Sequence, residues 1–479
     1  METRFRRAVR VVCVDKSGRV LLMRWRDPHD GSLLWEPPGG GVDPGEDFLT
    51  AARRELTEET GLDPAAVAPV YVLVERDVNW RGVHYAGPEA FFLARYDTDE
   101  PALASDGLLD YETQTLEQRR WTPVEELAGL DRLEPPELPE VLADLTARTA
   151  PDADAEAFIT GRFGKRASAP VLLGAGEWSR AYAFTLDGED VIAKIGAYGE
   201  DFAKDAAVAE LTRGVVDVPE VLERGRAGER HFVVARRAHG SYLDELDGDG
   251  MREVLPSLFA TMRSVRGFVA PGSGFGTWGP DGVAPHASWA EALTAILGPE
   301  HPRIAGWKAA LESSPTGSGP FEEAAGVLRE LAAVCPDVRQ VVHSDLLYRN
   351  ALVEGGRISA VLDWGNSLYG DGLYDLAWLV YWWPFYPSWK GVDISAEVRA
   401  HLRGTGEYGE DTELRLRCCL VHIGLDAQAY NAFTGRFGEL AFNAERTLAF
   451  ARGLAGEPVV EGGGEGGPVP RETGQRRLG

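Results

Sequence analysis

Short runs of hydrophobic residues near the start of the chain predict β-strands. Residues 8–14 and 20–24 are rich in Val and Leu and are separated by a Lys-Ser-Gly turn. A helical spacing of apolar residues follows over Phe48–Thr60, and Gly61 stands where a C-terminal cap is needed. Further strand-like runs lie at 70–75 and 89–96. These elements predict an α/β domain in the first part of the chain.

A second set of patterns begins near residue 171. A strand, a glycine-containing turn and a return strand span Leu172–Phe184, and a short apolar strand follows over Val191–Ile195. Farther on, Val341–Trp364 contains three short apolar runs around a polar loop. This last stretch gathers the side chains around which we expect the rest of the second part to be organised.

Composition places the chain among ordinary globular proteins. Its 479 residues are enough for about three domains of roughly 150 residues. Hydrophobic residues make up 44% and charged residues 26%, and we find neither a membrane-spanning run nor a signal peptide. The four cysteines show no metal-ligand or disulfide spacing, which is typical of the cytoplasm. The net charge of −26 disfavours nucleic acid as a partner and is compatible with cationic ligands.

Three glutamates of the predicted helix, Glu55, Glu58 and Glu59, share one face because they lie three and four residues apart. Like charges so close together destabilise a helix unless a cation lies between them, so the cluster predicts Mg²⁺. The alternative is an exposed acidic helix with no ligand.

The segment around this helix resembles the Nudix hydrolases, a resemblance that implies an α/β/α sandwich and hydrolysis of a nucleoside diphosphate derivative. It matches the Nudix box at Gly40, Glu46, Arg54, Glu55, Leu56, Glu58, Glu59, Gly61 and Leu62. By that resemblance Glu55, Glu58 and Glu59 hold the metal, Glu58 and Glu59 are catalytic, and Arg54 and Glu46 orient them. Glu112 or Glu117 is a candidate for a further catalytic carboxylate.

The polar loop after Val342 has the spacing of a phosphoryl-transfer site. His343, Asp345 and Asn350 follow the H-x-D-x-x-x-x-N pattern of kinase catalytic loops, and Asp363 comes after two further apolar runs. Asp345 is suited to accept the proton of an attacking hydroxyl, and Asn350 and Asp363 offer oxygen ligands to Mg²⁺. The alternative is that these residues only cap turns and strand ends.

The patterns upstream of this loop predict a nucleotide site. Lys194 lies on the apolar strand at the place of the kinase lysine that pairs with ATP phosphates, and Glu210 is its expected ion-pair partner. Gly174, Gly176 and Ser179 lie in the hairpin that would cover those phosphates. A solvent-facing lysine on an edge strand is the alternative for Lys194.

From about Val171 to Gly453 the chain resembles the aminoglycoside phosphotransferase family, most closely its hygromycin B phosphotransferase branch. The resemblance rests on seven segments in order: GEWSRAYAF, VPEVLERG, ARRAHG, GFGTWGPDG, residues 341–364, YGDGLYDLAW and HIGLDAQAYNAF. It implies a bilobal kinase-like fold with Asp345 as the base, Asn350 and Asp363 as Mg²⁺ ligands, and Lys194 on the phosphates.

The acceptor side departs from that branch, because the aromatic stretch Leu379–Trp389 has different residues. Its aromatic side chains are candidates either for core packing or for a wall that stacks on a sugar; they are Trp382, Trp383, Phe385 and Tyr386. Asp426 and Glu439 are candidates for meeting ammonium groups of an aminoglycoside, or are ordinary surface acids. Asp371 and Asp375 are expected to be structural.

Together these patterns predict a Nudix domain at 1–133, a Pro- and Ala-rich linker at 134–169, a kinase domain at 170–455 and a disordered tail at 456–479. The predicted function is ATP- and Mg²⁺-dependent O-phosphorylation of an aminoglycoside, giving antibiotic resistance, alongside Nudix hydrolysis. One alternative is a metabolic kinase for an amino alcohol or sugar, with the Nudix domain hydrolysing a pathway nucleotide. Another is a Nudix domain that senses a ligand without turnover.

Overall fold

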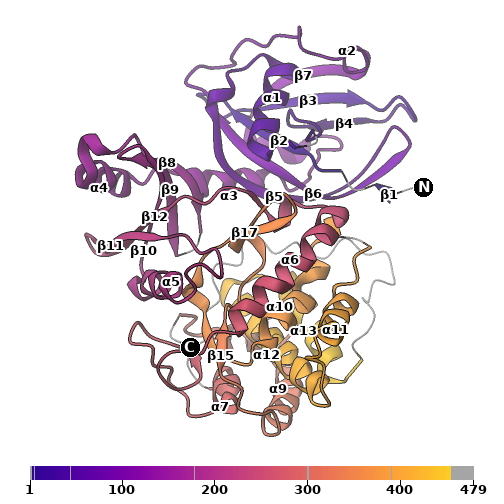
Figure 1. Ribbon diagram of the computed structural model, residues 1–479. Coiled ribbons are helices and arrows are strands. Elements are labelled where there is room, and N and C mark those ends of the chain that lie inside the picture. Colours follow the sequence, from indigo (N-terminus) through magenta and orange to yellow (C-terminus); the bar gives the residue numbers. More distant parts are fainter. Residues whose placement is uncertain are drawn as a thin grey trace. The chain divides into compact units, whose positions relative to one another are not determined.

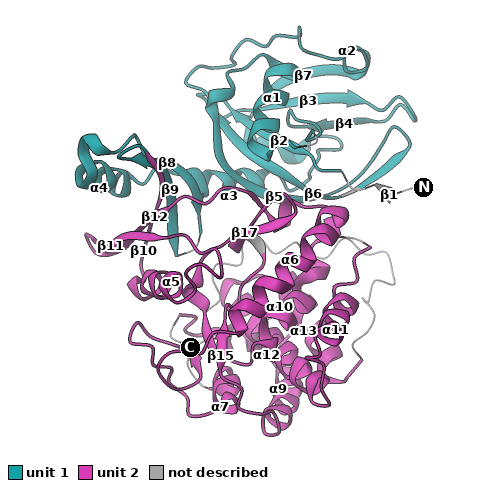
Figure 2. Ribbon diagram, viewed as in Figure 1, with its two compact units in different colours: residues 1–188 teal, residues 189–479 magenta. Residues whose placement is uncertain are grey.

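The computed structural model describes residues 3–4, 6–43, 45–176, 178–298, 301, 303–389 and 391–454. The chain divides into two compact units, Met1–Gly188 and Glu189–Gly479 (Figure 2). The tail predicted at 456–479 lies outside the described residues. Among the residues that are described, no helix is both long and apolar enough to cross a membrane.

The first unit is built on a mixed sheet with the strand order β1-β6-β2-β3-β4, in which β5 pairs with β6 and β7 with β3. Its strands are β1 (Thr3–Arg4), β2 (Val9–Val14), β3 (Val20–Arg26), β4 (Leu33–Glu36), β5 (Val67–Trp80), β6 (Val83–Arg95), β7 (Leu116–Thr122), β8 (Val171–Ala175) and β9 (Ser179–Leu186). Its helices are α1 (Phe48–Thr60), α2 (Asp110–Thr115), α3 (Leu138–Thr149) and α4 (Ala153–Phe163), with 3-10 turns η1 (Pro64–Ala66), η2 (Val124–Gly129) and η3 (Gly164–Arg166).

Strand β2 shows why this sheet is covered on both faces. Side chains along a strand alternate between its two sides. Val9 and Val11 therefore pack with α1 residues such as Leu56, while Val12 and Val14 pack on the other side in a cluster that includes α3. Figure 1 shows α1 lying over the sheet. This confirms the predicted α/β/α sandwich.

Helix α3 falls inside the range predicted as a linker, yet it packs in the core of the first unit. Leu138, Val141, Leu142 and Leu145 are buried and belong to the same cluster as Phe91. They recur at the three- and four-residue spacing that places side chains on one face of a helix. The predicted linker range thus contains a helix with a structural role in the preceding sheet.

In the second unit β10 pairs with β12 and β12 with β11, and two small sheets have the orders β13-β16-β17 and β14-β18-β15. The strands are β10 (Glu189–Gly196), β11 (Val221–Ala227), β12 (Arg230–Arg236), β13 (Ser241–Tyr242), β14 (Gly276–Thr277), β15 (Gln340–Val342), β16 (Ala351–Glu354), β17 (Arg357–Val361) and β18 (Leu368–Gly370).

The helices of the second unit supply most of its core. They are α5 (Gly199–Leu211), α6 (Gly248–Arg266), α7 (Trp289–Thr294), α8 (Trp307–Ser313), α9 (Gly319–Ala332), α10 (Leu373–Trp382), α11 (Ile394–Gly404), α12 (Thr412–Thr434) and α13 (Phe437–Ala451). The 3-10 turns are η4 (Leu243–Glu245), η5 (Ala295–Leu297), η6 (Tyr348–Asn350), η7 (Trp364–Asn366), η8 (Trp383–Phe385) and η9 (Pro387–Trp389).

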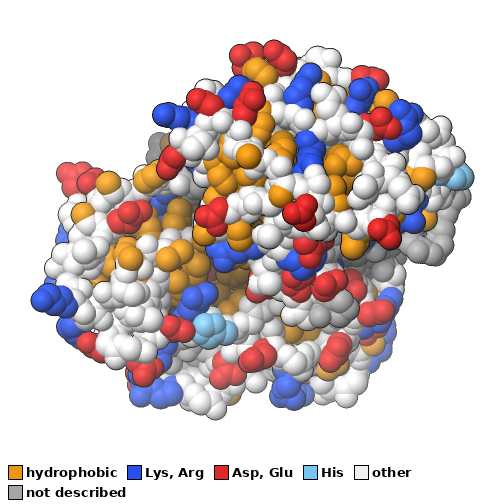
Figure 3. Space-filling view, turned by 90° about the horizontal axis from the view of Figure 1, so that it is seen from above, with side chains coloured by type: hydrophobic (Ala, Val, Ile, Leu, Met, Phe, Trp, Pro, Cys, Tyr) orange, Lys and Arg blue, Asp and Glu red, His pale blue; other side chains and the backbone are white. Residues whose placement is uncertain are grey.

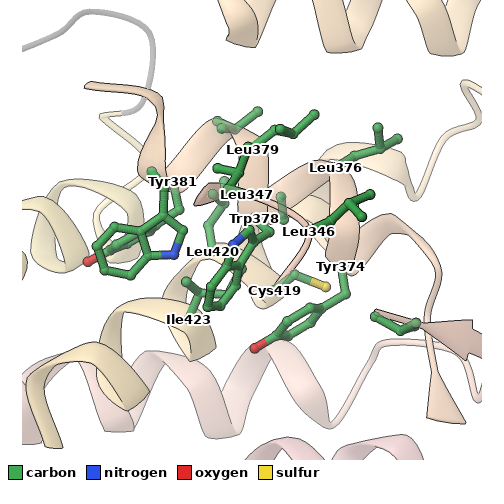
Figure 4. Close-up of a cluster of buried hydrophobic side chains, with 14 of the residues drawn as sticks. Leu346, Leu347, Tyr374, Leu376, Trp378, Leu379, Tyr381, Cys419, Leu420 and Ile423 are labelled. Atoms are coloured by element: carbon green, nitrogen blue, oxygen red, sulfur yellow. The ribbon is translucent and has the colours of Figure 1, made fainter. Parts of the chain in front are cut away.

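The centre of this core anchors the polar loop that follows β15. Leu346 and Leu347 are buried at 1% and 2% exposure, and Figure 4 shows them among side chains of α10 and α12, including Leu379 and Leu420. Two leucines between Asp345 and Asn350 therefore fix the loop to the helical core. The charged surface is mixed in sign, and Figure 3 shows acidic, basic and apolar side chains interspersed on the face that it views.

Candidate active sites

Helix α1 carries the first candidate site, and its ends are set by local sequence. The side chain of Asp47 accepts a hydrogen bond from the Thr50 amide at the N-terminus. Gly61 ends the helix in a left-handed conformation with φ of 68°, which glycine adopts without a steric penalty. The helix runs over Phe48–Thr60, as predicted, and therefore holds its glutamates in the predicted register.

Arg54 binds three carboxylates of this site. Its guanidinium contacts Glu46 at 2.9 Å, Glu55 at 2.9 Å and Glu58 at 3.1 Å, and Nη2 also donates to the Gly41 carbonyl at 2.9 Å. These hydrogen bonds lower the pKa of Glu46 and raise that of Arg54. The orienting role expected of Arg54 and Glu46 thus has a direct geometric basis.

Glu59 lies deeper than its neighbours. It is 3% exposed and accepts a hydrogen bond from the Gly39 amide at 2.7 Å. Burial raises the pKa of Glu59 well above its usual value, although the Gly39 amide and Arg10 counteract the shift. Burial also raises the pKa of Glu55. Glu58, in contrast, has a half-exposed side chain.

Gly40 is required by the closeness of the glycine-rich turn to the helix. A Cβ at this position would lie 2.5 Å from the Glu55 carboxyl group. The turn after β4 therefore lies directly against the acidic face of α1, and its backbone amides border the carboxylates.

A divalent cation suits this donor set. Carboxylate oxygens are the ligands that Mg²⁺ prefers, and a cation would offset the burial that raises the pKa of Glu55 and Glu59. Within the described ranges, no three Asp, Glu, His or Cys side chains converge closely enough to hold an ion as they stand. Arg54 occupies the space between two of the glutamates, so ligation by all three requires their side chains to leave it.

The two further carboxylates proposed from sequence differ in their surroundings. Glu117 forms an exposed ion pair with Arg26 at 2.6 Å. Glu112, on α2, adds its charge to the field that raises the pKa of Glu59, and it accepts a hydrogen bond from Tyr111 at 2.8 Å. The structure therefore favours Glu112 as the additional acid near α1.

Sequence reasoning did not identify the charged cluster beneath this site. Arg10 contacts Glu36 at 2.9 Å and Glu89 at 3.0 Å, and Arg76 contacts Glu36 at 3.0 Å. Burial alone would raise the pKa of Glu89, but the two arginines hold it below its usual value. The alternation of charged and apolar residues in β2, β5 and β6 was the available signal.

The second candidate site lies in the loop after β15. His343 is fully buried, and burial lowers its pKa to about 4. Its Nε2 donates to the Leu362 carbonyl at 2.9 Å, and its Nδ1 accepts from the Asp345 amide at 3.2 Å. A neutral imidazole thus ties the start of the loop to the strand that precedes Asp363.

Asp345 and Asn350 are held on opposite ends of one loop. Asn366 donates from Nδ2 to Asp345 Oδ2 at 3.1 Å. Asn350 donates from Nδ2 to the Asp345 carbonyl at 2.7 Å, which leaves its amide oxygen as the acceptor available to a metal. The predicted base and one predicted metal ligand are therefore brought together.

Lys194 pairs with Asp363, a partner that the sequence patterns did not predict. Lys194 Nζ lies 3.6 Å from Asp363 Oδ2. Burial alone would lower the pKa of Lys194, but Asp363 and Asp205 together raise it. The Asp363 carboxylate and the Asn350 amide oxygen are ligand types that suit Mg²⁺, and the Lys194 ammonium suits phosphates.

The structure places Glu210 apart from Lys194. Its side chain is 70% exposed and pairs with Arg213, which lies just beyond the end of α5. Asp205, five residues earlier on α5, is the acid that faces Lys194, and burial raises its pKa to about 6. Five residues correspond to about 500° around a helix, so the two acids point in different directions.

Two residues of the loop region adopt the left-handed backbone conformation although neither is glycine. Ser344 has φ of 63° and Asp363 has φ of 60°.

The backbone amides of His343 and Ser344 both donate to the carboxylate of Asp375, at 3.1 and 2.8 Å. Asp375 is thus a structural residue, and Asp371 is another, since it pairs with Arg415 at 2.7 Å.

The remaining predicted residues lie in ordered surroundings. Gly174, Gly176 and Ser179 lie on the β8–β9 hairpin, where the Gly176 amide donates to the Ser179 carbonyl at 2.9 Å. Their role in binding phosphates stays a prediction.

The aromatic residues around Pro384 pack on one another, since Trp382 and Phe385 are each 4% exposed with ring centroids 5.0 Å apart. Asp426 and Glu439 are buried.

Comparison with known proteins identifies both parts of the chain. Residues 4–145 match the model of the NUDIX domain, and residues 171–410 match that of the phosphotransferase enzyme family. An RNA pyrophosphohydrolase of Dinoroseobacter shibae is 33% identical over 145 residues, covering 27% of this chain and 83% of the relative. Hygromycin-B 4-O-kinase of Escherichia coli is 29% identical over 287 residues, covering 59% of this chain and 81% of the relative.

Solved structures agree with the second match. Aminoglycoside phosphotransferase APH(4)-Ia is 28% identical, with a TM-score of 0.56 over 64% of this chain and 99% of that chain. A thermostable mutant of the same protein, in ternary complex with AMP-PNP and hygromycin B, has a TM-score of 0.55 at 29% identity over 64% of this chain and 100% of that chain. The chain therefore belongs to the phosphotransferase enzyme family and carries a NUDIX domain ahead of its phosphotransferase segment.

Proposed function

We propose that the second part of the chain transfers the γ-phosphoryl group of ATP to a hydroxyl of an aminoglycoside, in the cytoplasm. One observation carries this proposal: the Asp345 carboxylate is held by Asn366 while Lys194 pairs with Asp363. The proposed proton acceptor and the proposed phosphate-binding lysine of β10 thus contact residues 366 and 363 of one short segment. The likeness to hygromycin-B 4-O-kinase supports an aminoglycoside as the acceptor.

The chemical step follows from these positions. The acceptor oxygen attacks the γ-phosphorus, the bond from that phosphorus to the bridging oxygen breaks, and ADP leaves with the electron pair. Asp345 takes the hydroxyl proton. Mg²⁺, when held by Asn350 and Asp363, offsets the charge on the phosphate oxygens. Lys194 binds the phosphates, and Asp363 and Asp205 keep it protonated.

Charge supports a cationic acceptor. The whole chain has a net charge of −26, and Asp426 and Glu439 are buried acids on α12 and α13. Ammonium groups are attracted to such a field and repelled by a basic one. The second candidate is a metabolic kinase for an amino alcohol or a sugar, which the same loop geometry supports, because that geometry fixes the phosphoryl chemistry and not the acceptor.

An acceptor screen tests the proposal. Purified full-length protein is given ATP and Mg²⁺ with hygromycin B, other aminoglycosides, choline and simple sugars, and ADP release is followed. Turnover with an aminoglycoside is expected. Turnover with a metabolite but with no aminoglycoside would select the metabolic kinase. If none of the tested acceptors gave turnover, the kinase proposal would be rejected in both forms.

We further propose that the NUDIX domain hydrolyses a pyrophosphate bond in a nucleoside diphosphate derivative. The carboxylates of Glu46, Glu55 and Glu58 around Arg54 support this proposal, as does the buried Glu59 carboxylate on the same helix, which accepts a hydrogen bond from the Gly39 amide. Water attacks one phosphorus, the bridging P–O bond breaks, and the proton passes to a glutamate. Mg²⁺, when bound by Glu55, Glu58 and Glu59, supplies an activated water.

The substrate panel includes nucleoside diphosphate sugars, dinucleoside polyphosphates and RNA with a 5′ pyrophosphate, because relatives are RNA pyrophosphohydrolases. Phosphate or mononucleotide release that depends on Mg²⁺ is expected for one class. A protein that binds a panel member without cleaving it would instead support a ligand-sensing NUDIX domain.

A further inference from the structure

Two consecutive residues of α5 contact the segment that follows Asp363. Asp205 accepts a hydrogen bond at Oδ1 from the Trp364 amide at 2.8 Å. Lys204 donates from Nζ to the carbonyls of Gly365 and Ser367, at 3.1 and 3.0 Å. The turn of residues 364–367 is therefore bound at both ends by neighbouring side chains of one helix. We call this segment the 364–367 turn.

The middle residue of the 364–367 turn contacts the catalytic loop. Asn366 donates from Nδ2 to Asp345 Oδ2 at 3.1 Å, and its carbonyl accepts from Ser344 Oγ at 2.7 Å. Both contacts depend on where the backbone of Asn366 lies. The two carbonyls that Lys204 binds belong to the residues on either side of Asn366, so Lys204 fixes that backbone position directly.

We propose that Lys204 is a positioning residue for phosphoryl transfer, which holds Asn366 so that Asn366 orients the Asp345 carboxylate. This inference rests on the proposed kinase function and extends it to a residue that touches neither substrate nor phosphate. Asp205 binds the Trp364 amide of the same turn, and its charge acts on Lys194. Helix α5 therefore interacts both with the phosphate lysine and with the turn that holds the base.

The burial of Lys204 indicates a specific role. Its side chain is 1% exposed and its ammonium lies 5.2 Å from the centre of the Trp278 ring. Transfer of a lysine out of water is unfavourable unless its donors find acceptors, whereas a Met or Leu would fill the same volume without that cost. Burial lowers the pKa of Lys204 to about 7, which reflects the same desolvation. The two carbonyls of the 364–367 turn offset this cost, together with the charges of Glu200 and Asp205.

The chain provides a matched control. Lys308 also donates to a backbone carbonyl, that of Leu297 at 2.9 Å, and its ammonium lies 5.4 Å from the Trp307 ring. It contacts neither the 364–367 turn nor the loop of Asp345 through any of these bonds. Lys308 is only partly buried, whereas Lys204 is buried. Lys204→Met and Lys308→Met therefore both remove an ammonium that donates to backbone carbonyls near a tryptophan ring, and only the ammonium of Lys204 is connected to the base through these bonds.

The first measurement separates kcat from KM in the acceptor reaction. Lys204→Met should lower kcat by about 10-fold or more but by less than the roughly 10² to 10⁴ that a positioned general base contributes, with KM for ATP changed less than about twofold. Lys308→Met should keep both values. In the Asp345→Asn background, Lys204→Met should have no further effect on kcat, since both changes act on the same function, proton acceptance by Asp345. Additive losses would overturn the inference.

The second measurement requires no acceptor, so it decides the inference even if hygromycin B and every other compound prove inactive. Hydrogen exchange should become faster in residues 343–350 as well as in residues 364–367 of Lys204→Met, and in neither segment of Lys308→Met. Faster exchange confined to the 364–367 turn, with the catalytic loop unchanged, would contradict the inference. If Lys204→Met does not fold, Lys204→Gln, which keeps one donor, should give the same pattern at smaller amplitude.

Discussion

Asn366 Nδ2 lies 3.1 Å from Asp345 Oδ2. Because an amide nitrogen can only donate, this bond identifies Oδ2 as an acceptor and directs the other carboxylate oxygen of Asp345 away from Asn366. The orientation of the base is thus set by a residue 21 positions along the chain. Replacement of the Asp345 carboxylate with a carboxamide therefore has a defined consequence for phosphorylation.

In Asp345→Asn, phosphorylation should fall by about 10² to 10⁴, because the side chain keeps its size but can no longer take a proton. ATP binding should persist, since Lys194, Asn350 and Asp363 are unchanged. The measurement is kcat for the acceptor together with ATP affinity. NUDIX hydrolysis measured on the same preparation should be unaltered, and parallel loss of both activities in folded protein would contradict separate sites.

In Glu58→Gln, hydrolase activity should collapse while the protein stays folded. Glu58 contacts Arg54 at 3.1 Å but its side chain is 47% exposed, so the loss of its charge costs the fold little. The matched control is Glu117→Gln, which also breaks an exposed pair with an arginine. Hydrolysis rate and thermal unfolding are measured for both variants. Unfolding of Glu58→Gln at ordinary temperature would show that the residue is structural.

Gly40→Ala should impair hydrolysis and leave phosphorylation unchanged. The added methyl group would lie 2.5 Å from the Glu55 carboxyl, so either that carboxylate or the turn must move. Gly129→Ala is the control, because a Cβ there meets no atom within 4 Å. Rates and Mg²⁺ dependence of hydrolysis are compared. Full activity of Gly40→Ala would mean that Glu55 can leave its observed position without loss.

His422 should make the free energy of unfolding decrease at acidic pH. Burial lowers its folded pKa to about 3, whereas the unfolded value is near 6.5. Between these values the unfolded chain binds a proton that the folded chain does not, so the free energy of unfolding falls as pH decreases, by up to about 1.4 kcal/mol per pH unit.

The test compares the pH dependence of thermal unfolding between pH 7 and 5 in the wild type and in His422→Gln. The variant should show a shallower dependence, since the other titrating groups are common to both proteins. His239→Gln is the control, because the His239 side chain is 61% exposed. An unchanged slope in His422→Gln would mean that His422 titrates normally in the folded protein.

Local patterns predicted the elements that depend on neighbours in sequence. The Asp47 cap and Gly61 define α1, so its bounds and its glutamate register could be found from residues 47–61 alone. The order of His343, Asp345 and Asn350 likewise predicted a catalytic loop, and hydrogen bonds join all three residues in the structure. These features are short-range, and a single sequence records them directly.

Long-range contacts could not be found in this way. Lys204 reaches carbonyls 161 and 163 residues away, and no motif marks it as different from other lysines. Glu210 was predicted as the partner of Lys194, where the structure has Asp205. Both acids follow Lys194 on one helix, and only packing decides which of them faces the lysine. Helix α3 was read as linker because its flanking prolines and alanines obscured the stripe from Leu138 to Leu145.

The left-handed conformation of Ser344 and Asp363 limits how this enzyme can diversify. Residues other than glycine, asparagine and aspartate are disfavoured at such φ values, while Ser344 Oγ and the Asp363 carboxylate both have partners that glycine would lose. Random mutagenesis should therefore recover almost no tolerated variants at these two positions. Laboratory evolution toward a new acceptor would have to proceed through other residues, with these two positions inherited unchanged.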